Sequence, residues 1–136
     1  MGSFTDLRCD PDVMKNAESD VIGTLSDTDA EDLKLVASKD KLLQDLTAAL
    51  RYNKSDSDDL AKVDTIISGN ESRFQTVLMY LQLWYYFREV FNIEGDQDYL
   101  RMLDYERLYK AERNGFADLS PDTTKTTTTL TMVLRG

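Results

Sequence analysis

The segment Ser72–Phe91, SRFQTVLMYLQLWYYFREVF, is the most apolar stretch of the chain and decides the fold. Its apolar side chains recur every three or four residues, which places them on one face of an α-helix. A further set of apolar residues lies off this face, so one neighbouring element is not enough to cover the helix. The sequence therefore predicts a central helix. The residues expected to form its core or assembly face are Phe74, Leu78, Leu81, Trp84 and Tyr85.

The aromatic residues of this helix allow two interpretations. Tyrosine and tryptophan carry polar groups that need hydrogen-bond partners when their rings are buried, so the edges of the helix are expected places for another protein to bind. Burial inside a small bundle explains the phenylalanine and leucine positions better, and for the tyrosines both interpretations stay open. Polar residues such as Arg73, Gln82 and Arg88 interrupt the run before it reaches the roughly 18 to 20 apolar residues of a membrane span.

The composition argues against most enzyme chemistry. At 136 residues the chain fits one domain, and it contains no histidine and a single cysteine, Cys9. Without histidine, the usual catalytic triads and zinc sites are unavailable. We expect Cys9 to be unreactive. The sequence predicts no catalytic residue, no cofactor and no metal site.

The formal net charge of −9 opposes binding to nucleic-acid phosphates. An acidic surface does suit a protein that DNA must pass without sticking. No apolar signal segment follows Met1, so we expect an intracellular, soluble protein without a membrane anchor.

Helix-capping signals divide the chain before the central helix. Asp10 followed by Pro11 is typical of a helix start, and Thr28–Glu31 has the form of a capping box. Val13 and Val36 are assigned to the apolar sides of the helices that follow. The expected helices run from about residue 10 to 23, from 28 to 52 and from 57 to 69, with Ser57 capping the third and Asn70 capping the central helix.

Asp96 is expected to cap a last helix that extends to about Phe116. Its apolar side is expected to consist of Tyr99, Met102, Leu103, Tyr109 and Phe116. Two antiparallel helices joined by a short glycine-containing turn make a helical hairpin, so the fold class is all-α. We divide the chain into an N-terminal arm at 1–9, a helical body at 10–119 and an extended C-terminal arm at 120–136.

The C-terminal arm has a different pattern. From Lys125 the sequence KTTTTLTMVLRG is rich in threonine, and apolar side chains alternate with the others in the manner of a β-strand. A lone strand has no mate in a helical bundle, so it must pair with a partner. A flexible threonine-rich linker is the competing interpretation. The residues predicted to bind a partner are Thr127, Thr129, Leu130, Thr131, Met132, Val133, Leu134 and Arg135.

The acidic clusters at 27–29, 56–59 and 96–98 invite a calcium interpretation. None has the twelve-residue loop with a central glycine and a terminal glutamate that an EF-hand requires. Helix capping explains each cluster. The glycines are scattered and form no phosphate-binding loop.

Taken together, these parts resemble the head-to-tail connector, or adaptor, proteins of tailed double-stranded DNA bacteriophages. The resemblance is carried by the acidic, helical N-terminal half and by four segments: the aromatic TVLMYLQLWYYFREVF, the turn EGDQD, the amphipathic YLRMLDYERLYKAERNGF and the threonine-rich ending VLRG. It implies a helical subunit that forms a homo-oligomeric ring, usually of twelve copies, beneath the portal protein. DNA would pass through the ring, tail or stopper proteins would lie below it, and the C-terminal arm would reach the portal. The implied location is the virion neck, after assembly in the host cytoplasm.

Two alternatives from other classes remain. An acidic helical protein that mimics DNA would bind a basic partner through regularly spaced carboxylates. A small enzyme using carboxylates alone would need a particular pair of Asp or Glu residues, and the sequence singles out none.

Overall fold

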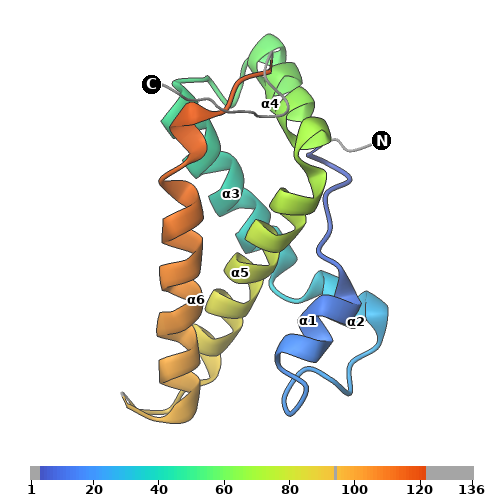
Figure 1. Ribbon diagram of the computed structural model, residues 1–136, viewed down its shortest axis with the longest axis vertical. Helices are drawn as coiled ribbons and strands as arrows, with labels where there is room; N and C mark the ends of the chain where they lie inside the picture. The colour runs from blue at the N-terminus through green and yellow to red at the C-terminus, as the bar shows by residue number, and fades with distance from the viewer. Residues whose placement is uncertain (1–3, 94, 122–136) are drawn as a thin grey trace, which may run out of the picture.

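The structure is a computed structural model that describes residues 4–93 and 95–121, and all regular elements of this part are helical (Figure 1). The predicted all-α class is therefore confirmed for the body. The β-type arm expected from Lys125 lies outside the described residues. The elements are α1 (Pro11–Ala17), α2 (Asp27–Asp32), α3 (Leu35–Leu50), α4 (Ser57–Gly69), α5 (Glu71–Val90), α6 (Gln97–Arg113) and the 3₁₀ turn η1 (Phe116–Asp118).

Helix α5 lies at the centre of the molecule. Helix α6 runs antiparallel beside it along its length, and α3 packs against it as well (Figure 1). Of the residues predicted for its core, Phe74, Leu78 and Leu81 have no exposed surface, and Trp84 is also buried. Tyr85 is half-buried. The helix therefore organises the fold from inside.

Aromatic side chains join α5 to α6 and η1 at successive levels of the hairpin. Such rings bury a large apolar area, and tilted or offset pairs add about 0.5 to 1.5 kcal/mol each beyond that burial. They fix the two helices against each other. The pairs, with their centroid distances, are Phe87–Tyr105 at 6.1 Å, Trp84–Tyr109 at 6.0 Å and Phe74–Phe116 at 5.8 Å.

The long helix predicted from residue 28 to 52 is wrong, because the chain breaks between α2 and α3. Lys34 adopts a left-handed backbone conformation with φ of 51°. The Gln82 amide of α5 donates hydrogen bonds to the carbonyl oxygens of Glu31 and Leu33, at 2.9 and 2.7 Å. These bonds satisfy carbonyl groups that a broken helix leaves free. The break thus depends on a side chain about fifty residues away, which local periodicity does not contain.

Several predicted helix ends also move. Helix α1 ends at Ala17 instead of Gly23, and turns lead from there to α2. The cap of α2 is Ser26, whose hydroxyl accepts from the Asp29 N–H at 3.1 Å, so the capping box predicted at Thr28 is wrong. The start at Asp10 is confirmed, because its carboxylate accepts from the Asp12 N–H.

Side-chain hydrogen bonds to backbone groups also mark the starts of α4 and α6 and the end of α4. Asp56 caps α4, one residue before the predicted Ser57. Asn70 does not cap α5, because its amide instead donates to the Ile66 carbonyl at the end of α4, at 2.9 Å. Asp96 caps α6 as predicted, accepting from the Tyr99 N–H at 2.8 Å.

The described part of the N-terminal segment, residues 4–9, packs against the helices. Leu7 and Cys9 are buried, and the Phe4 N–H donates to the Asp64 carboxylate at 2.9 Å. Burial raises the pKa of the Cys9 thiol to about 12. The thiol therefore stays protonated and inaccessible at neutral pH.

Candidate functional site

The residues predicted to bind a partner fall into two groups that the structure treats differently. The arm residues from Thr127 to Arg135 lie outside the described residues. The α5 residues Phe74, Leu78 and Leu81 are inaccessible in the subunit, so they support packing and offer no surface to a partner. Tyr85 is half-buried, with the Arg88 guanidinium 4.3 Å from its ring centroid. Of these α5 positions, only Tyr85 keeps enough exposed surface to contact a partner.

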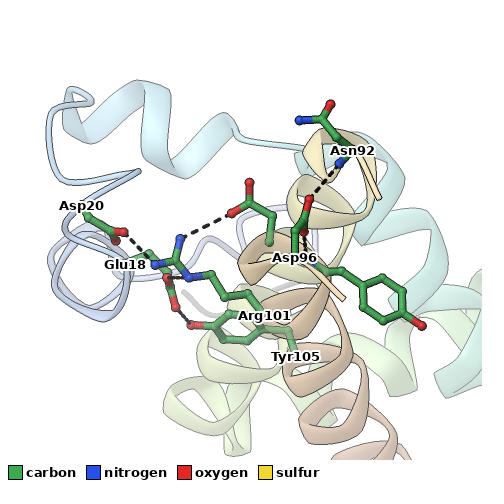
Figure 2. A network of polar contacts seen from close by, with 8 residues as sticks. Glu18, Asp20, Asn92, Asp96, Arg101 and Tyr105 are labelled. Atoms are coloured by element: carbon green, nitrogen blue, oxygen red, sulfur yellow. Dashed lines mark hydrogen bonds and ion pairs between the residues drawn. The ribbon is translucent and has the colours of Figure 1, made fainter. Parts of the chain in front are cut away.

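The largest polar cluster is the Arg101 clamp, which we define as Arg101 of α6 with Glu18, Asp20 and Asp98 (Figure 2). Arg101 lies 2.7 Å from Asp20, 3.3 Å from Glu18 and 3.5 Å from Asp98, measured between nitrogen and carboxylate oxygen. The Tyr105 hydroxyl donates to the other oxygen of Glu18 at 2.5 Å. The clamp ties the turn after α1 to the hairpin.

Electrostatics show that the clamp stabilises charges already present at neutral pH. The hydrogen bond from Arg101 holds the pKa of Asp20 below its usual value, and Asp20 raises the pKa of Arg101. Burial, together with the bond to Glu18, raises the pKa of Tyr105. None of these shifts brings a group closer to titration near pH 7, where a general acid or base works best. The clamp is therefore a structural contact.

A second polar cluster joins α3 to α6. The Tyr109 hydroxyl donates to the Asp45 carboxylate at 2.6 Å, and Lys41 and Arg113 lie 3.2 and 3.8 Å from the same group. Burial and the bond to Asp45 raise the pKa of Tyr109. These contacts hold the Asp45 carboxylate of α3 against Tyr109 and Arg113 of the α6 end of the hairpin.

No group of three or more metal-ligating side chains comes together within residues 4–93 and 95–121. Within the same residues, no helix is both long and apolar enough to cross a membrane.

The outer surface of α6 is one place where the structure departs from the predicted apolar faces. Leu103, assigned to the buried side, is 39 % exposed, and Leu100 beside it is 54 % exposed. Both lie off the face that carries Met102, Tyr105 and Tyr109 to the core, because successive helix residues turn by about 100°. We name the residues on this surface the α6 outer stripe: Leu100, Leu103, Arg107, Lys110, Ala111 and Asn114.

The α6 outer stripe is close to flat, with gaps between its side chains. A shallow, open depression of about 450 Å³ is lined by Leu103, Ala111 and Asn114 together with the charged residues Glu106, Arg107 and Lys110. The charged residues pair within the helix, Arg107 with Asp104 at 3.5 Å and Lys110 with Glu106 at 2.7 Å. The surface therefore combines an apolar floor with charges that balance.

Two more valines predicted to be buried are exposed. Val36, at the start of α3, is 76 % exposed, and Val13 of α1 is 48 % exposed. Val36 was placed by assuming one continuous helix from residue 28, and the break at Lys34 changes the face on which it lies.

Comparison with known proteins returned no matching family model, no similar curated protein and no similar solved structure.

Proposed function

We propose that the chain is a structural subunit of a head-to-tail adaptor ring in a tailed double-stranded DNA bacteriophage. The ring lies at the virion neck, below the portal protein and above tail or stopper proteins, and DNA passes through it. The subunits are made in the host cytoplasm and assemble there.

The observation that carries this proposal is a pair of exposed leucines, Leu100 and Leu103, on the outer stripe of α6 in a chain with a net charge of −9. Exposed leucines beside each other on one helix face favour a protein interface. Three of the segments that carry the resemblance to adaptor proteins, the aromatic segment, the turn after it and the segment that follows, correspond to the hairpin of α5 and α6. A structural subunit with a docking face on this hairpin fits both features.

The charge supports the proposed passage of DNA. A surface with excess carboxylates repels phosphates, so a channel formed by such subunits does not retain the genome. We expect the isolated subunit to show no sub-micromolar, salt-sensitive affinity for duplex DNA. A fluorescence-anisotropy titration measures this directly.

The C-terminal arm is proposed to anchor the ring to the portal by adding a strand to an exposed sheet edge. Ordering each arm residue costs about 1 to 2 kcal/mol of backbone entropy, so repeated attachment around a ring is needed to hold it.

The test mixes the protein with DNA-filled heads that end in a portal, comparing the full chain with a truncation lacking 122–136. The full chain should sediment with the heads, whereas the truncation should keep its helical circular dichroism and fail to attach. The proposal is wrong if the full chain does not attach, and the assignment of the anchor to the arm is wrong if the truncation attaches equally well.

A further inference from the structure

The structure exposes a second stripe, on α3, that matches the α6 outer stripe. The α3 outer stripe consists of Val36, Ala37, Asp40, Gln44 and Ala48. These residues recur at helical spacing and are all exposed. At 1.5 Å per residue, the α3 stripe is about 18 Å long and the α6 stripe about 21 Å long. The two surfaces are of similar length.

Their side chains are complementary in size. The α3 stripe carries small residues, Ala37 and Ala48, and one protruding apolar side chain, Val36. The α6 stripe carries the larger side chains Leu100 and Leu103, with only a shallow depression beside Leu103 and Ala111. Helices pack by placing ridges of one in the grooves of the other, so the alanines of the α3 stripe leave room for the larger Leu103 side chain of the α6 stripe.

The charges favour a second copy of this chain as the occupant. Of the 25 acidic and 16 basic residues in the chain, α3 holds two of each and α6 holds four of each, so the other segments carry the entire charge of −9. Two copies that meet through α3 and α6 therefore bring together elements without net charge. The Asp40 carboxylate on the α3 stripe can form an ion pair with Arg107 or Lys110 on the α6 stripe.

We propose that the α6 outer stripe of one copy packs against the α3 outer stripe of the next. This deepens the proposed function, on which it rests, by assigning the faces through which subunits meet. The two stripes are different surfaces, so the contact is heterologous and can repeat from copy to copy until a ring closes. Arg107 and Lys110 exchange exposed pairs within α6 for Asp40 at small cost, since such pairs contribute about 0 to 1 kcal/mol.

Cysteine crosslinking tests this arrangement in the full chain. Cys9 is buried with a raised pKa, so introduced thiols react selectively. A chain carrying both Val36→Cys and Leu103→Cys should give a ladder of dimers, trimers and larger products with a short bismaleimide, which tolerates small offsets in register. Mixing the two single variants should give dimers only. The matched control combines Val13→Cys, another exposed valine, with Leu103→Cys, and should give no ladder.

Three results would overturn the inference. These are no ladder with Val36→Cys and Leu103→Cys, an equal ladder in the Val13→Cys control, or equally fast dimers from Leu103→Cys alone, which indicate that α6 pairs with α6. Circular dichroism of each variant confirms that it is folded. A ladder without attachment to heads rejects the adaptor function but keeps the interface, whereas attachment without a ladder rejects the interface but keeps the function.

Discussion

Helices α5 and α6 lie side by side, yet neighbours cover them to very different extents. In α5, buried residues lie on nearly every side, including Val77, Met79 and Leu83 as well as the predicted core positions other than Tyr85. In α6, only Met102, Tyr105 and Tyr109 are buried, and the opposite side carries exposed leucines. The difference shows that leucine has two roles in this hairpin. In α5 it stabilises the subunit, and in α6 it forms a surface.

The largest expected effect is on stability, from truncating a leucine in each helix. Leu81→Ala should lower the free energy of unfolding by about 2 to 5 kcal/mol, because Leu81 has no exposed surface and the lost side chain leaves a cavity. Leu100→Ala in α6 should change it by less than about 0.5 kcal/mol. Urea denaturation followed by circular dichroism measures both. Equal losses would contradict the distinction between the two helices.

The next largest effect on the free energy of unfolding is expected from replacing Gln82, the buried polar residue of α5. Gln82→Leu should cost about 1 to 3 kcal/mol, since two carbonyl oxygens at the break between α2 and α3 lose their donor. Gln75→Leu, at a half-buried position on the same helix, is the matched control and should cost less. Hydrogen exchange should rise in α2 and at the start of α3 in the first variant. Unchanged exchange there would show that the break is held by something else.

On α6, the partly buried Arg101 of the clamp can be compared with the exposed Arg107 in the same way. Arg101→Gln should cost about 1 to 2 kcal/mol, because a partly buried arginine with several carboxylate partners contributes more than an exposed pair. Arg107→Gln, at an arginine that is 70 % exposed, should have little effect on stability. Faster amide exchange at residues 18–26 in the first variant alone would locate the effect in the turn after α1. An equal effect of both substitutions would reject the clamp.

The smallest expected effect is the pH dependence of the stability that the Asp96 cap contributes at the start of α6. The pKa of Asp96 is lowered because its carboxylate accepts the Tyr99 N–H and further backbone N–H groups. Its contribution is present above the unfolded pKa, near 4, and is lost as the pH falls through the lower folded value. The advantage in melting temperature of the wild-type chain over Asp96→Asn should therefore shrink from about pH 5 to about pH 2. A constant difference would contradict this, and Asp104→Asn is the control.

The sequence predicted the parts of the fold that depend on local signals. The periodicity of α5, the caps at Asp10 and Asp96, and the hairpin with α6 needed only neighbours in the chain. The break at Lys34 could not be predicted, because it depends on hydrogen bonds from Gln82. From the sequence alone, Gln82 was recognised only as a polar residue that interrupts the apolar run of the central helix.

The candidate site was harder to predict than the fold. We assigned apolar residues at helical spacing to buried helix faces. This assignment is correct only where another element of the subunit packs against that face. Leu103 and Val36 lie where the described part of the subunit does not cover them, and periodicity cannot show that. The partner-binding residues predicted on the arm, from Thr127 onward, stay a prediction.

The most direct test of the central claim is the molar mass of the protein as a function of concentration, measured by sedimentation equilibrium. The wild-type chain should rise above the monomer mass, whereas Leu103→Asp should remain a monomer with unchanged helical circular dichroism and urea midpoint. If the wild type stays monomeric throughout, or if Leu103→Asp associates as the wild type does, the outer stripe of α6 is not an assembly surface.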